Sequence, residues 1–119
     1  MGFYMIQKLT TQEKLALPAR TATTVLGENI RIARKRRGWT MAEMAMSMLV
    51  QRKTLSRLEA GDPSVGLSVL ASALHALGMS RDLQKVADPS ADSVGKFSDK
   101  QRLPKRVRKK STNKNELDF

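Results

Sequence analysis

The sequence predicts an all-α protein: one small domain of four or five short helices, followed by a basic C-terminal tail that we expect to be disordered. Hydrophobic residues make up 40% of the chain but aromatic residues only 4%, so the core must consist of Leu, Ala, Met, Val and Ile. This mixture suits short packed helices better than a sheet. With 119 residues the chain has room for one domain and its tails.

The charge of the chain indicates a polyanionic partner. The formal net charge at pH 7 is +11 and the pI is about 10.6. Nucleic acid is the first candidate partner and an anionic membrane surface the second, although some small proteins are basic without a specific reason. We find no secretory signal at the N-terminus and no apolar run of the ~18 residues that a membrane span requires.

The absence of cysteine and the single histidine exclude most site chemistry. Without cysteine there can be no disulfide, cysteine zinc site or thiol catalysis, which fits a reducing cytoplasm. His75 has no partner residues for a metal site or a catalytic triad, so we predict no enzymatic activity, no metal and no cofactor. The seven Met residues are interpreted as core-filling side chains.

Two terminal regions flank the periodic part of the chain. Residues 1–22 are interpreted as a flexible N-terminal arm, because Pro18 is expected to break any helix there. Residues 88–119 begin at Asp88-Pro89 and hold few large apolar residues, so the tail is expected to be disordered in isolation. The tail carries a concentrated block of basic residues: Lys105, Arg106, Arg108, Lys109 and Lys110.

Residues 23–87 form the predicted domain, whose first helix should run from about Thr24 to Arg37. Leu26, Ile30 and Ala33 follow one another at helical spacing and define its buried face. Gly38 ends this helix.

A second helix opens at Thr40, because Glu43 follows at the spacing of a capping box. Its buried side is predicted to consist of Met41, Met44, Ala45 and Met48. After a short turn at Leu49-Val50, a third helix spans residues 51–60. A fourth covers residues 67–77, and residues 80–87 allow one more short helix. The inner face of the fourth helix is predicted to be Leu67, Leu70, Ala71, Leu74 and Leu77.

The third helix carries the predicted DNA-reading surface. A helical wheel places Leu55 and Leu58 on the buried side and cations with small polar residues on the other. Arg can bind guanine with both ends of its guanidinium group, and Lys and Ser can reach a base edge or a phosphate. An ordinary solvated face would have a similar composition, so the prediction of DNA binding also depends on the helices that precede and follow this one. The residues predicted to contact bases are Gln51, Arg52, Lys53, Ser56 and Arg57.

The helical segments together resemble the Cro/CI (XRE, lambda repressor-like) helix-turn-helix family over about half of the chain. The resemblance implies a bacterial regulator of four or five helices that binds paired DNA half-sites as a dimer. It also implies an ion pair between Arg34 and Glu59, which could otherwise be two independent surface charges. The stretches that carry it include Arg34 … Arg37-Gly38-Trp39-Thr40 and Thr54-Leu55-Ser56-Arg57-Leu58-Glu59-Ala60-Gly61.

Two positions depart from the family pattern. Met41 stands where the family usually has a phosphate-binding Gln, so phosphate contacts must come from other side chains or from backbone amides. Leu49 stands where the family usually has Gly; if Leu49 adopts a positive φ, the turn carries a conformational cost. The residues predicted to hold phosphate are Arg31, Thr40, Met41 and Thr54.

Within the family, the chain is most similar to HipB-type antitoxins, on Arg36–Thr40, on Thr54–Pro63 and on the tail around Arg102–Lys109. The likeness implies a homodimer that represses its own operon and restrains a HipA-type serine/threonine kinase toxin. Two alternatives stay open: a stand-alone phage-type or metabolic repressor, and a protein-interaction adaptor that has lost DNA reading.

Overall fold

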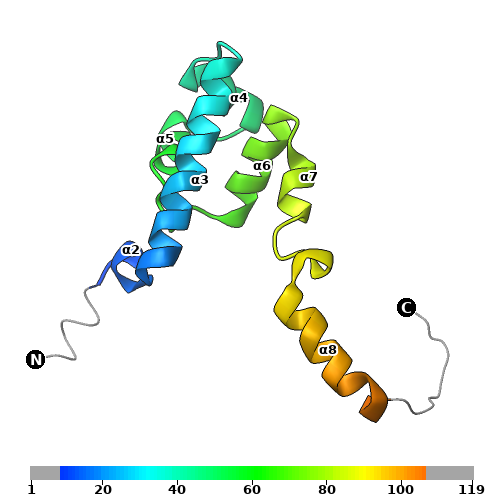
Figure 1. The fold of residues 1–119 in the computed structure, drawn as a ribbon. Coiled ribbons are helices and arrows are strands. Elements are labelled where there is room, and N and C mark those ends of the chain that lie inside the picture. The colour runs from blue at the N-terminus through cyan, green and yellow to red at the C-terminus, as the bar shows by residue number, and fades with distance from the viewer. Residues whose placement is uncertain (1–8, 107–119) are drawn as a thin grey trace, which may run out of the picture. The chain divides into compact units, whose positions relative to one another are not determined.

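The computed structural model describes residues 9–106, with side chains up to residue 102, and every regular element in this part is helical (Figure 1). This confirms the predicted all-α class. The chain divides into two compact units, residues 1–84 and 85–119. No helix within the described residues is long and apolar enough to cross a membrane. The elements are α2 (Thr11–Lys14), α3 (Leu17–Arg36), α4 (Met41–Met48), α5 (Arg52–Glu59), α6 (Leu67–Leu77), α7 (Ser80–Gln84), the 3-10 helix η1 (Pro89–Ala91) and α8 (Ser93–Arg106).

The first long helix begins earlier than predicted. α3 starts at Leu17 rather than near Thr24, and Pro18 lies in its first turn. The prediction that Pro18 breaks a helix was wrong, because a first-turn residue needs no N–H and the fixed φ of proline suits that position. The preceding short helix α2 has a capping box of its own, in which Thr10 and Glu13 bond each other's backbone N–H.

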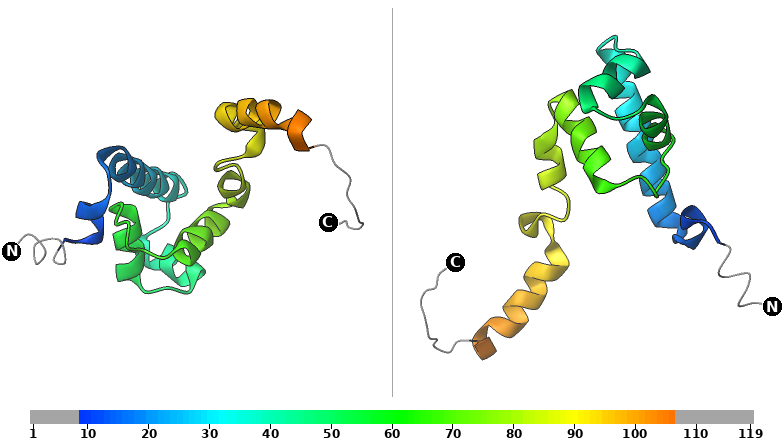
Figure 2. Two further views of the ribbon diagram at one scale, coloured as in Figure 1. Left: turned by 90° about the horizontal axis from the view of Figure 1, so that it is seen from below. Right: turned by 180° about the vertical axis from the view of Figure 1, so that it is seen from behind.

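The core of the first unit lies between α3, α4, α5 and α6. α3 runs along one side of the unit. It is in front in Figure 1, and the two turned views of Figure 2 show that α5 and α6 both lie behind it there. The second to fourth helices have nearly the predicted bounds, and Met44, Ala45 and Met48 are buried as predicted. The buried apolar cluster consists of Ile30, Met44, Ala45, Met48, Leu55, Leu58, Ala73 and Leu77.

The inner face of α6 was predicted only in part. Leu74 and Leu77 are buried, but Leu67 is 70% exposed and Ala73, which the prediction left out, is fully buried. Leu67 is the first residue of α6. Because a helix can bury only the turns that other elements cover, an apolar residue at its end can stay in solvent.

The second unit contains η1 and α8, although its composition predicted disorder. Hydrogen bonds between residues that are close in the sequence stabilise these turns. Ser90 N–H donates to Asp88 Oδ1 (2.9 Å) and Gly95 N–H donates to Asp92 Oδ1 (2.9 Å). Residues 89–91 and 93–106 are therefore helical in the part of the tail that the structure describes, since local capping needs no apolar core. Of the basic block, Lys105 and Arg106 fall at the end of α8, whereas Arg108, Lys109 and Lys110 lie outside the described residues.

Candidate nucleic-acid interface

The candidate interface begins at the N-terminus of α4. Thr40 caps this helix as predicted: its Oγ1 accepts a hydrogen bond from Glu43 N–H (3.0 Å), and Glu43 Oε1 accepts one from Thr40 N–H (2.8 Å). The capping box fixes where α4 starts and leaves the first helical N–H groups, beginning with that of Met41, directed outward. Such a helix N-terminus favours a negatively charged group.

The turn between α4 and α5 depends on Leu49. This residue has φ 59° and ψ 40°, in the left-handed region, and its side chain is 91% exposed. Its N–H donates to the carbonyl of Met46 (3.1 Å), and Val50 N–H donates to that of Ala45 (3.0 Å). Leu49 therefore ends α4 in the way that a glycine would. Because its φ is positive, the turn carries the conformational cost of a left-handed non-glycine residue.

Replacing Leu49 by Gly is expected to stabilise the protein by about 0.5–1 kcal/mol, since relief of the left-handed conformation outweighs the extra freedom of Gly in the unfolded chain. Urea unfolding followed by circular dichroism measures the change. Leu49→Ala is the matched control, because it removes the exposed side chain and keeps the strained φ. Equal stabilisation by Ala and Gly would show that the exposed leucine side chain, and not the backbone, carries the cost.

A buried ion pair holds α5 against α3. Arg34 Nε lies 2.7 Å from Glu59 Oε2, and its second terminal nitrogen lies 3.0 Å from Glu59 Oε1; the two side chains are 8% and 3% exposed. The remaining terminal nitrogen of Arg34 donates to the carbonyl of Trp39 (2.9 Å). The hydrogen bonds that Arg34 donates to Glu59 raise the pKa of Arg34 above its ordinary value. The pair joins the last residue of α5 to the last turn of α3.

Close backbone contact also joins the two helices. A Cβ on Gly27, in the middle of α3, would lie 2.6 Å from the carbonyl oxygens of both Leu58 and Glu59. A Cβ on Gly61 would lie 2.6 Å from the Cα of Thr24 on the other side of the same contact. Sequence reasoning missed this role, although a glycine inside a helical pattern is a signal of close approach.

The outer surface of α5 presents all of the residues predicted to contact bases. Leu55 is completely buried and Leu58 is 6% exposed, so they turn the opposite side of α5 to solvent. Within the described residues, no hydrogen bond or ion pair holds the side chain of Arg52 or Lys53. The exposed residues of this surface are Gln51, Arg52, Lys53, Ser56 and Arg57.

Arg57 differs from the other cations of α5, because the loop after the helix holds its side chain. Its Nε lies 3.0 Å from Asp62 Oδ2, and one terminal nitrogen donates to Ser64 Oγ (2.7 Å). Hydrogen bonds from the Ser64 hydroxyl and N–H, together with Arg57, lower the pKa of Asp62 to about 2. The carboxylate is therefore ionised at neutral pH and keeps the guanidinium group in a defined orientation.

No hydrogen bond within the described residues joins the side chains of the four residues that were predicted to hold phosphate. Arg31 bonds to Glu28 within α3 (3.3 Å), and Thr54 is half-buried in α5. The side chain of Met41 is partly buried and packs against the core, and it has no polar atom to hold a phosphate. Thr40 is exposed, but its hydroxyl oxygen already accepts the capping bond.

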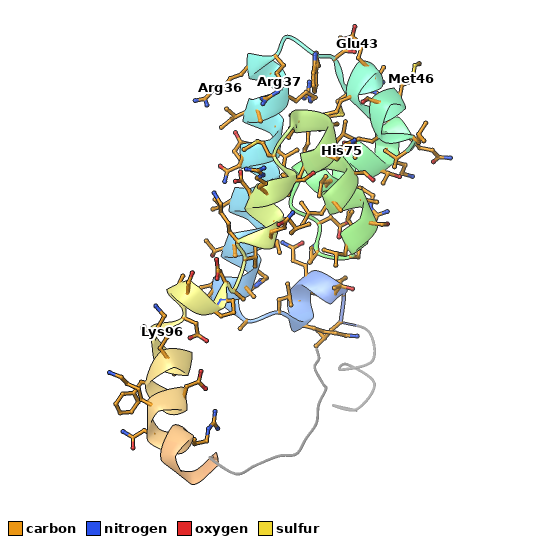
Figure 3. The ribbon with its side chains drawn as sticks, turned by 90° about the vertical axis from the view of Figure 1, so that its right-hand side faces the viewer. Arg36, Arg37, Glu43, Met46, His75 and Lys96 are labelled. Atoms are coloured by element: carbon orange, nitrogen blue, oxygen red, sulfur yellow. The ribbon has the colours of Figure 1, made fainter. Side chains whose placement is uncertain are left out.

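Nothing in the described part of the chain resembles a metal site. No group of three His, Asp or Glu side chains is placed to hold an ion among residues 9–102. His75 is exposed on α6 (Figure 3).

Comparison with known proteins agrees with this geometry. A family model described as a helix-turn-helix domain matches residues 25–86, more than half of the 119-residue chain. The match covers α4, the turn and α5, and most of α3. No curated protein and no solved structure matches significantly.

Proposed function

Because the chain belongs to the helix-turn-helix domain family, which makes it a DNA-binding regulator, we propose that it is a sequence-specific transcriptional repressor of the Cro/CI type. The observation that carries this proposal is the outer surface of α5. Four exposed polar and basic residues lie on α5 and a fifth, Gln51, is its N-cap; the Arg34–Glu59 pair and the Gly27 contact hold this helix rigidly. A preorganised helix of this kind can enter a major groove without losing much further entropy.

The side chains of α5 have different roles in this proposal. Arg52 and Lys53 have no hydrogen-bond or ion-pair partner among the described residues, and they lie in the first turn, the part of a recognition helix that reaches base edges. Ser56 bonds to a base or a phosphate. Arg57 is oriented by Asp62, so it contacts one fixed position of the site. A phosphate binds the first N–H groups of α4 beside Thr40.

The resemblance to HipB-type antitoxins supports a finer proposal. Two copies of the chain bind one palindromic operator in their own promoter, and the dimer restrains a HipA-type serine/threonine kinase toxin. The basic end of the chain adds affinity for DNA that decreases with salt, or contacts an acidic surface of the toxin. Co-expression with a neighbouring kinase gene tests the toxin proposal: co-purification and loss of toxicity support it, and a free, still toxic kinase contradicts it.

A second candidate function is that of an adaptor without DNA reading. Its support is a pair of exposed apolar residues at the end of α4: Met46 (76% exposed), labelled in Figure 3, and the C-cap residue Leu49 (91% exposed). If this function holds, neutralising Arg52, Lys53 and Arg57 together leaves the biological role unchanged.

Binding to a labelled DNA fragment from upstream of the gene, over a salt series and with unrelated DNA as competitor, tests the repressor. Arg52→Ala and Arg57→Ala are each expected to lose about 1–3 kcal/mol of specific binding, roughly 5- to 150-fold in Kd. Arg81→Ala, an exposed arginine of α7, is the matched control and should change Kd little. Binding that competitor abolishes completely, with the α5 variants unchanged, would contradict operator reading.

A further inference from the structure

The outward face of α3 carries an apolar stripe, Val25 and Ile32, that is not part of the domain core. Val25 is 50% exposed and Ile32, two helical turns further on, is 39% exposed. At 100° per residue they lie opposite Ile30 and Arg34, which are buried in the domain. Ala22 and Asn29 are exposed on the same side, and Thr21 and Arg36 are exposed on it toward the two ends of the stripe. α3 has 20 residues and is about 30 Å long, long enough for several turns of helix packing.

We infer that this stripe is the surface on which a second copy of the chain binds, with the two α3 helices antiparallel. This inference rests on the dimer in the proposed function and identifies its interface. The two-fold axis passes close to Asn29, midway between Val25 and Ile32, so Val25 of each copy faces Ile32 of the other. The Asn29 side chains lie near the axis, where a polar residue in an apolar seam fixes register.

The charge distribution along α3 selects the antiparallel orientation. Arg31, Lys35 and Arg36 crowd the second half of the helix, whereas Arg20 is the one charged residue between Leu17 and Gly27. Parallel helices would place the two basic halves side by side. In the antiparallel pair each basic half lies against the nearly uncharged half of the other copy, which separates like charges.

The position of α5 agrees with the same orientation. In Figure 1, α5 lies to the left of α3 and α6 to its right, and both views of Figure 2 agree. The two-fold axis of an antiparallel helix pair is perpendicular to the plane of the two helices, so it keeps both copies of α5 on the same side. With helix spacings of 8–10 Å, the two α5 helices lie about 25–30 Å apart, close to one turn of DNA. Parallel pairing would send them to opposite sides, where one duplex could not meet both.

Sedimentation of the full chain without DNA tests the surface. The wild type should associate as its concentration rises, and Ile32→Glu should abolish association. Met46→Glu is the matched control, because Met46 is a more exposed apolar residue on α4 and should leave association unchanged. Thermal unfolding verifies that both variants stay folded. A wild type that stays monomeric with and without operator DNA, or Ile32→Glu that still dimerises, would overturn the inference.

Single cysteines determine the orientation, because the natural chain has none. In the antiparallel pair, Asn29→Cys lies near the axis and should form a disulfide-linked dimer, whereas the two copies of Ala22→Cys lie about 20 Å apart along the helices and should not. Mixing Val25→Cys with Ile32→Cys should also give linked dimers. Ser47→Cys, exposed on α4, measures random collision. Linkage by both Asn29→Cys and Ala22→Cys would indicate parallel helices, and linkage no faster than Ser47→Cys at every position would refute the interface.

Failure of the dimer surface and failure of DNA reading give different results. If only the surface is wrong, Ile32→Glu keeps the wild-type association and wild-type binding to the full operator. If only DNA reading is wrong, the cysteine links still form but Arg52→Ala changes no binding. If both proposals hold, Ile32→Glu weakens binding to a full operator much more than binding to a half-site.

Discussion

Glu59→Ala is expected to destabilise the domain by about 3–5 kcal/mol, because it leaves the charged guanidinium of Arg34 buried without its carboxylate. Arg34 is 7% exposed and bonds to both oxygens of Glu59, so water cannot replace the lost partner without opening the contact between α3 and α5. For a domain of this size, such a loss is a large fraction of the total stability. Urea unfolding followed by circular dichroism measures it.

The double variant Arg34→Met/Glu59→Leu is the control for this prediction. It removes both charges and fills the space with apolar side chains, so its stability should be near that of the wild type or above it. A similar loss in the double variant would mean that the shape of the pair, and not an uncompensated charge, carries the effect. A loss below 1 kcal/mol in Glu59→Ala would contradict the buried state of the pair.

Gly27→Ala is expected to have the second large effect, a loss of about 3 kcal/mol or more, although Ala normally stabilises the middle of a helix by about 1 kcal/mol over Gly. The added methyl group would lie 2.6 Å from two carbonyl oxygens and 2.7 Å from the N–H nitrogen of Gly61. These are backbone atoms of α5 and its C-terminal turn, so they cannot move aside as a flexible side chain does. Either α5 shifts away from α3 or the domain unfolds.

Gly66→Ala is the matched control for Gly27→Ala. Its Cβ would meet only the Ser68 hydroxyl, at 3.8 Å, and its φ of −68° suits any residue. This variant should change the unfolding free energy by about 1 kcal/mol at most. DNA binding adds a second measurement: if Gly27→Ala stays folded with α5 displaced, specific binding should fall while non-specific binding stays. Equal stabilities of the two variants would show that α3 and α5 are not in close contact.

The exposed basic face of α5 was predictable because its determinants are local. Thr40 and Glu43 each accept a hydrogen bond from the other's backbone N–H across one helical turn. The spacing of Leu55 and Leu58 determines which side of α5 faces solvent. Whether these exposed residues touch bases is a prediction for the binding experiment. The ion pair of Arg34 with Glu59 spans 25 residues, and only the family resemblance indicated it.

What the sequence determined by itself is the helical class, the order and near-bounds of the second to fourth helices and the basic outer face of α5, since each depends on contacts within one or two turns. The tertiary structure alone decided which end of α6 is covered, that Asp62 holds Arg57, and that Gly27 must lack a side chain. It also showed an exposed stripe on α3. These features depend on how helices distant in the sequence meet, because burial and close approach are properties of a neighbour's position and no local pattern encodes that position.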